Sequence, residues 1–124
     1  MTLSLEQATA IADRLQRALT RPPAALPSPA SAGWTLAGAS ARFLMGRHLP
    51  VVAFERDGST LGFIVSPKDL QAPVYKRSAR FDLVYFSEDV PDDQQQSVYD
   101  RNRAMIDRFA AWLIAWDRLG EPLP

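Results

Sequence analysis

Few side chains in this chain can do acid–base or anion-binding chemistry, and the single histidine stands out among them. His48 follows Arg47 in a predicted turn before a strand, where its imidazole could act as a general base or contact a phosphate. Arg80 and Asp82 could complete a polar cleft around it for a small ligand. No Ser, Asp or Glu can be assigned to His48 as a partner. We therefore assign no catalytic residue, and a surface or structural histidine is the simpler interpretation.

Metals and cofactors are not expected. The chain has no cysteine, which excludes thiolate nucleophiles and cysteine-ligated zinc or iron–sulfur sites. The carboxylates Asp89, Asp92 and Asp93 lack the alternating ligands, the glycine and the distal glutamate of an EF-hand loop. Their position before a predicted helix favours a capping role, because the helix dipole is positive there. The glycines form neither a GxGxxG motif nor a Walker loop, so nucleotide phosphate binding has no support.

Asp82 is the most interesting carboxylate of the chain. It lies in the run from Arg80 to Phe86, which has the alternation of a strand but is largely apolar on both faces. A carboxylate facing a surface covered by a helix needs a partner, because burying an unpaired charge is costly. Arg42, Arg80 or Lys76 could supply that partner. The sequence therefore predicts a buried ion pair at Asp82.

The charge of the chain is balanced overall but unevenly distributed. Fourteen basic and 14 acidic residues give a net charge of zero, so there is no general attraction to nucleic acid or to acidic membranes. Residues 42–80 are basic and residues 81–124 are acidic. These two parts could attract each other within one fold or between two copies, and we favour the first. The basic residues around Tyr75 lack an RNP-like pattern, so nucleic acid is not an expected partner.

The location of the protein is inferred from what the sequence lacks. No apolar run approaches the roughly 18 residues of a membrane helix, and the run Phe109–Trp116 is far too short. The N-terminus does not have the basic region and apolar core of a signal peptide. The absence of cysteine favours a reducing compartment. We expect a cytoplasmic protein with no membrane partner.

The chain of 124 residues is predicted to form one domain, residues 1–124, with a helix at each end. Ser4 and Gln7 have the spacing of a capping box, which marks the start of the first helix. The last helix has a wide apolar face suited to packing on a sheet. In chain order, the predicted segments are a helix (1–21), a proline-rich linker (22–33), antiparallel strands (34–86) and a helix (90–119).

The strand region carries the strongest local signal, the pair Asp57-Gly58 between two β-rich runs, which predicts a type I′ hairpin. Further on, residues 66–69 (Ser-Pro-Lys-Asp) predict a short helical turn before the last strand. The fold class is therefore α+β: an N-terminal helix, a central antiparallel sheet of three to five strands, and a long C-terminal helix packed on the sheet. This element order is similar to that of small dimeric secretion-chaperone folds, although no motif accompanies it.

The tryptophans give the last functional hint. Trp112 and Trp116 lie four residues apart on one helix face, and with Trp34 they could either fill the core or anchor a partner. Ile114 falls at the edge of the polar side of the same helix, which favours an interface. The leading hypothesis is a non-enzymatic protein-binding, adaptor or chaperone-like domain that acts through an apolar-aromatic surface and self-associates. The alternatives are a small-ligand protein or enzyme subunit with a polar cleft around His48, and an immunity- or antitoxin-like protein.

Overall fold

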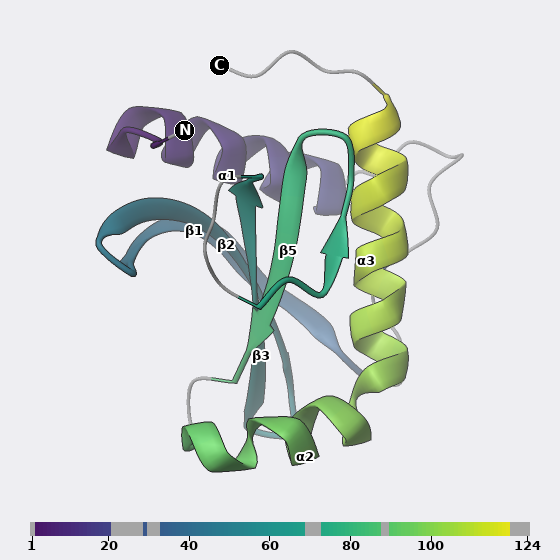
Figure 1. Ribbon diagram of the computed structural model, residues 1–124. Helices are drawn as coiled ribbons and strands as arrows, with labels where there is room; N and C mark the ends of the chain where they lie inside the picture. The colour runs from purple at the N-terminus through teal and green to yellow at the C-terminus, as the bar shows by residue number, and fades with distance from the viewer. Residues whose placement is uncertain (1, 21–28, 30–32, 69–72, 88–89, 120–124) are drawn as a thin grey trace.

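The computed structural model describes residues 2–20, 29, 33–68, 73–87 and 90–119, and it has the expected α+β fold (Figure 1). All neighbouring strands of its five-stranded sheet are antiparallel, in the order β1-β2-β3-β5-β4. The elements are α1 (Leu5–Thr20), β1 (Thr35–Leu44), β2 (Arg47–Arg56), β3 (Ser59–Pro67), β4 (Lys76–Arg77), β5 (Phe81–Phe86), a 3-10 turn η1 (Asp92–Gln94), α2 (Gln95–Arg101) and α3 (Arg103–Arg118).

The first helix begins as the sequence predicts. The backbone N–H of Ser4 donates to the Gln7 side-chain oxygen at 3.0 Å, and the N–H of Gln7 donates to the Ser4 hydroxyl at 3.1 Å. This reciprocal pair is the capping box, which satisfies two N–H groups that the first turn leaves without helical partners. The buried side of α1, which includes Ile11 and Leu15, packs in the main core. The predicted linker lies almost entirely outside the described residues.

Two tight turns make the hairpins of the sheet. Asp57 and Gly58 both have positive φ, 49° and 82°, as the type I′ prediction requires. Met45 and Gly46 have φ of 54° and 77° and join β1 to β2 in the same way. The helical turn predicted at residues 66–69 is wrong at its start. Ser66 and Pro67 instead end β3, where they pair with Asp82 and Phe81 of β5, and Asp69 lies outside the described residues.

The two faces of the sheet are packed differently. Because side chains alternate along a strand, Phe63 faces the helices while its neighbour Ile64 faces away. The helix side holds the main core, in which rings of β2, β3 and α3 meet; Phe63 and Phe109 have centroids 4.4 Å apart. The opposite side holds a smaller cluster of Leu49, Val51 and Ile64, with Val84 and Phe86 packed against it.

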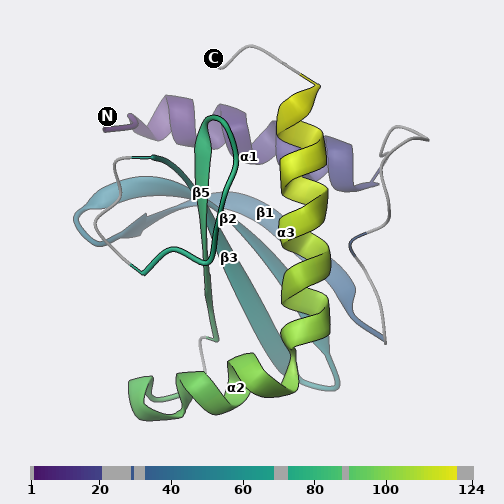
Figure 2. The same cartoon turned by 45° about the vertical axis from the view of Figure 1, so that its right-hand side comes forward.

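The predicted long C-terminal helix is two helices with a bend at Asn102. Its φ of −114° and ψ of 17° leave the helical range, so α2 ends there and α3 starts at the next residue in a new direction (Figure 2). The Asn102 side-chain amide donates to the carbonyl of Val98, and its oxygen accepts from the guanidinium of Arg56. Asparagine competes in this way for backbone groups that would otherwise continue a helix. As a result α3 lies along the sheet while α2 crosses its end.

Candidate functional site

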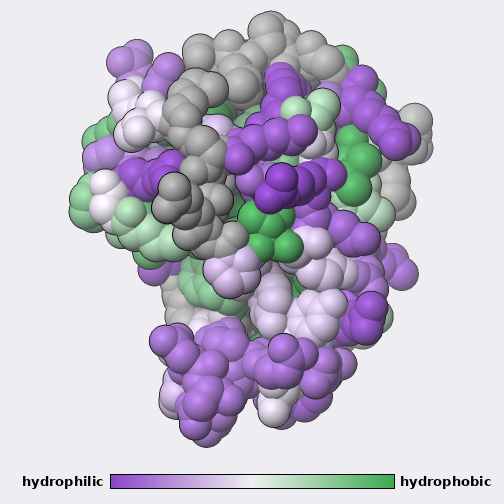
Figure 3. All heavy atoms as spheres, in the orientation of Figure 1, coloured by the Kyte–Doolittle hydropathy of each residue, from purple (hydrophilic) through white to green (hydrophobic). Residues whose placement is uncertain are grey.

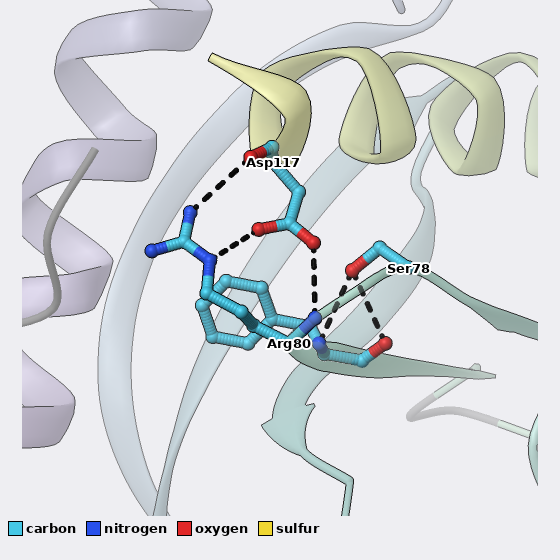
Figure 4. Close-up of polar contacts among 4 residues, drawn as sticks. Ser78, Arg80 and Asp117 are labelled. Atoms are coloured by element: carbon cyan, nitrogen blue, oxygen red, sulfur yellow. Dashed lines mark hydrogen bonds and ion pairs between the residues drawn. The ribbon is translucent and has the colours of Figure 1, made fainter. Parts of the chain in front are cut away.

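Arg80, one of the four residues expected in a polar cleft, is held by α3 instead. Its backbone N–H donates to Asp117 Oδ2 at 3.1 Å, and its Nε donates to Asp117 Oδ1 (Figure 4). Asp117 is 4% exposed. Burial by itself raises the pKa of its carboxyl, but hydrogen bonds from Ser78 and Arg80 and the charge of Arg80 together hold that pKa below its ordinary value. This contact joins the basic middle of the chain to its acidic end within one molecule.

Asp82 is fully buried and is ion-paired, but not with any of the three predicted partners. Its Oδ1 lies 3.5 Å from Nε of Arg77, a residue of the neighbouring strand β4 whose side chain is 64% exposed. Among the described residues, neither carboxylate oxygen has a hydrogen-bond partner. The carboxylate also faces away from the helices, because Phe81 and Leu83 on either side of it enter the main core. The sequence therefore predicted the burial and the ion pair correctly, but not the face or the partner.

Arg47 and His48 do not join Arg80 and Asp82 in a cleft. His48 lies within β2 rather than in a turn before it, opposite Phe43 of β1, and the two rings are 5.1 Å apart. β2 pairs with β3 only from Val51 onward, so His48 extends beyond β3 in the β1–β2 hairpin. Alternation places His48 on the helix side and Asp82 on the other side of the sheet. The polar cleft expected from the sequence is not formed by these residues.

The tryptophans expected at a partner interface are core residues. Trp34, Trp112 and Trp116 are 3%, 0% and 2% exposed, so none presents a surface to a partner. Trp112 and Trp116 stack on each other with centroids 6.2 Å apart, and the indole N–H of Trp112 finds no hydrogen-bond partner among the described residues. Ile114, between them, is half-buried. The wide apolar arc of the helix therefore serves packing on the sheet, the alternative that the sequence left open.

A groove that the sequence did not predict runs between the β1–β2 hairpin, β5 and α2. Its volume is about 1240 Å³. In Figure 3 the surface narrows above the hydrophilic α2, with apolar atoms in the recess. Among its described lining residues there is one cation, Arg42, and one anion, Asp92. The apolar and uncharged side chains between these two include Val84, Phe86 and all three tyrosines of the chain, Tyr75, Tyr85 and Tyr99.

The three tyrosines come from different elements and form one cluster. The ring of Tyr99 in α2 lies 5.1 Å from that of Tyr85 in β5 and 5.6 Å from that of Tyr75, just before β4. The Tyr85 hydroxyl donates to the carbonyl of Gln95 at 3.3 Å. Burial raises the pKa of Tyr85 above its ordinary value, and the nearby Tyr99 and Asp100 add to this. The cluster thus forms an aromatic wall of the groove in which Tyr85 stays neutral.

The edge of β5 that faces the groove is only partly paired. The carbonyl of Leu83 accepts from the N–H of Tyr75 at 2.8 Å, so the backbone groups of Leu83 point away from β3. In an antiparallel ladder the backbone groups of alternate residues point to the same side. The N–H and C=O of Tyr85 therefore also point away from β3, and within the described part of the chain we find no group hydrogen-bonded to them there.

Gln95 closes the next position along this edge. Its side-chain oxygen accepts from the N–H of Ser87 at 3.2 Å, and its amide nitrogen donates to the carbonyl of Ser87 at 3.0 Å. One side chain thereby makes the two hydrogen bonds that a residue of a neighbouring strand would make. The same amide also donates to the carbonyl of Val90 at 2.9 Å, which fixes its position. The open stretch of the edge is therefore bounded by β4 at one end and by Gln95 at the other.

Comparisons with known proteins add no relative: no family model matches the chain, and no curated protein or solved structure is significantly similar to it. None of the described helices is long and apolar enough to cross a membrane. No group of three or more His, Asp or Glu side chains that could hold a metal ion is found in the described ranges. The groove is our candidate binding site among the described residues, and its sequence signal is the alternation in β5.

Proposed function

We propose that this protein is a non-enzymatic protein-binding domain that takes an extended segment of a partner into the groove between β5 and α2. The observation that carries the proposal is the outward-pointing N–H and C=O of Tyr85. An unpaired strand edge recognises another extended backbone, and neighbouring pockets then select its side chains. The proposal keeps the leading hypothesis from the sequence, an apolar-aromatic binding surface, but moves it from the tryptophans to the tyrosines.

The size and lining of the groove support a peptide over a small molecule. Small-molecule pockets usually enclose about 300–1000 Å³, and this groove is larger and open along one side. Its lining residues are mostly uncharged, and Tyr99 and Phe86 offer large, rigid contact areas of the kind that dominate interface energies. None of its described lining residues is a histidine, the side chain that most often serves as a general base, which favours binding over catalysis.

The test is selection of peptides from a random library displayed on phage, followed by calorimetric titration of the selected sequences as synthetic peptides. We expect Tyr99→Ala to weaken binding at least about tenfold, because it removes a wall of the groove. Methylation of the peptide nitrogen that faces Tyr85 should have a similar effect, because it removes the donor to the Tyr85 carbonyl. Selected peptides that bind the Tyr99→Ala protein with unchanged affinity would show that the groove is not the binding site.

Phe43→Ala is the matched control for Tyr99→Ala. Phe43 is an aromatic residue with 66% of its surface exposed, but it is not among the residues lining the groove. The substitution should leave peptide affinity unchanged if the groove is the site. Thermal melting of both variants separates loss of binding from loss of folding. If Phe43→Ala loses peptide binding and Tyr99→Ala does not, the binding site is at the β1–β2 hairpin and not in the groove.

Self-association is a second proposal, and the hairpin tip supports it. Phe43 and Met45 are 66% and 55% exposed, and Met45 occupies a left-handed turn position that Asn or Asp usually fills. A large apolar residue kept at such a position suggests a use for its side chain. Sedimentation equilibrium tests this: we expect a dimer that Phe43→Ser disrupts. A monomer at all concentrations would rule it out.

The remaining parts of the proposal rest on sequence arguments. We propose a cytoplasmic location because a chain without cysteine is typical of a reducing compartment. An immunity- or antitoxin-like role predicts the same partner-binding behaviour as an adaptor or chaperone-like role, and neighbouring genes would distinguish them. The small-ligand alternative keeps no support from His48, because Asp82 lies on the other side of the sheet.

A further inference from the structure

We infer that Gln95 limits the partner segment paired with β5 to the stretch opposite Tyr85 and Phe86, and so determines the length and register of the bound peptide. This inference rests on the proposed function and concerns the same groove. The occupant is an extended peptide because the groups to be satisfied, the N–H and C=O of Tyr85, form the donor–acceptor pair that a strand residue complements. The boundaries of its paired stretch come from the contacts on either side.

Both neighbours of the open position already have partners. On one side, β4 occupies the edge at Leu83, whose carbonyl accepts from Tyr75. On the other side, the Gln95 amide satisfies both backbone groups of Ser87. A bound strand can therefore make its two ladder hydrogen bonds with Tyr85 alone. Gln95 acts here as a strand edge cap, which natural sheets use to prevent indefinite pairing.

The register also fixes which side chains of the peptide meet which wall. The residue opposite Tyr85 shares its side of the sheet and faces the Tyr75 and Tyr99 rings. The residue opposite Phe86 points to the other side, towards the Phe86 ring. The place beside Val84 is taken by Val74, because the N–H of the next residue, Tyr75, donates to Leu83. We therefore expect an aromatic side chain opposite Tyr85 and an apolar one opposite Phe86, whose ring lies 5.8 Å from the guanidinium of Arg42.

Three end-capped peptides test the length limit: Val-Tyr-Val, and the same core extended by Val-Thr at its N-terminus or by Thr-Val at its C-terminus. Binding is followed by NMR titration of the backbone amides of the full chain. The wild-type protein should bind all three with affinities within about threefold, because the extra residues find Ser87 already paired. Gln95→Met keeps the bulk of the side chain but not its hydrogen bonds to Ser87. One of the two extended peptides should therefore bind this variant about tenfold more tightly than Val-Tyr-Val does, because it can make two new hydrogen bonds with Ser87.

The adjacent residue provides the control. Gln96 also lines the groove, but its amide donates to Asp100 and not to the strand, so Gln96→Met should leave the length dependence unchanged. If Gln95→Met does not fold, Gln95→Glu keeps an acceptor for the Ser87 N–H but frees its carbonyl, and a gain of about threefold is expected. Equal affinities of all peptides for the Gln95 variants would overturn the inference while leaving the proposed function intact. Absence of binding of any peptide to the wild-type protein would contradict the proposed function itself.

Discussion

Asp117 in the last turns of α3 holds Arg80 at two points, its backbone N–H and its guanidinium. The contact fixes the start of β5 to the end of α3, beside the stacked rings of Phe81 and Trp116. Asp117→Asn keeps an acceptor for the N–H but loses the charge, so we expect the free energy of unfolding to fall by about 2 kcal/mol. Urea denaturation measures this. As a control, Asp107→Asn breaks only the exposed pair with Arg103 and should cost no more than about 0.5 kcal/mol.

The same carboxyl gives the protein a pH dependence. Its pKa is lower in the folded protein than in the unfolded chain, so its contribution to stability is complete above the unfolded value of about 4. This contribution is lost as the pH falls through the lower pKa of the folded protein. The stability difference between wild type and Asp117→Asn should therefore be constant from pH 5 to 7 and shrink below about pH 4. A difference that stays constant down to pH 2 would show that the charge of Asp117 does not stabilise the fold.

The fold was predictable where local chemistry decides it. The capping box at Ser4 and the Asp57-Gly58 turn need only neighbours in sequence, and both are confirmed. The bend at Asn102 was not predicted, because it depends partly on Arg56, 46 residues away. The two-residue strand β4 was also missed, since its residues Lys76 and Arg77 carry no strand pattern.

The candidate site was not predictable for a related reason. The tyrosine cluster draws one residue from each of three segments, and nothing in the spacing of Tyr75, Tyr85 and Tyr99 brings them together. Gln95 lies in an ordinary run of three glutamines, and only the tertiary structure places its amide on the edge of β5. In contrast, whether Trp112 and Trp116 fill the core or a partner interface stayed open in the sequence, because an apolar helix face predicts burial without showing what buries it; the structure places both in the core.

The buried carboxylate of Asp82 should contribute nothing to the free energy of unfolding or should lower it. Its fully buried carboxylate is ion-paired with Arg77 at 3.5 Å and accepts no hydrogen bond from the part of the chain that the structure describes, so the cost of removing it from water is poorly compensated. Asp82→Val should leave the free energy of unfolding unchanged or raise it by about 1–3 kcal/mol, because Arg77 can turn to solvent. Arg77→Ala should lower it, since it leaves the buried charge unpaired. If urea denaturation shows Asp82→Val to be less stable than the wild type, the carboxylate has a stabilising partner besides Arg77.

Gly62 positions Phe86, a lining residue of the groove. The two residues are cross-strand partners, and a Cβ added at Gly62 would lie 2.5 Å from the ζ carbon of the Phe86 ring. Gly62→Ala should therefore displace the ring, with a loss of about 1–3 kcal/mol in the free energy of unfolding. We also expect peptide affinity to fall, because Phe86 forms one side of the groove. Phe86→Leu in the Gly62→Ala background should recover the free energy of unfolding but not the peptide affinity. A double variant as unstable as Gly62→Ala would show that the clash lies elsewhere.

Hydrogen exchange can test the open edge before any partner is known. The amides of Val84 and Phe86 point towards β3 and the amide of Ser87 donates to Gln95, whereas no hydrogen bond of the Tyr85 amide is found among the described residues. Exchange rates follow local hydrogen bonding and opening, so the Tyr85 amide should exchange at least about tenfold faster than its two neighbours in the strand. Gln95→Met should raise the exchange rate of Ser87 to that of Tyr85 without changing Val84. Strong protection of Tyr85 in the isolated protein would mean that this position is already paired, and the groove would then have no open edge to offer a peptide.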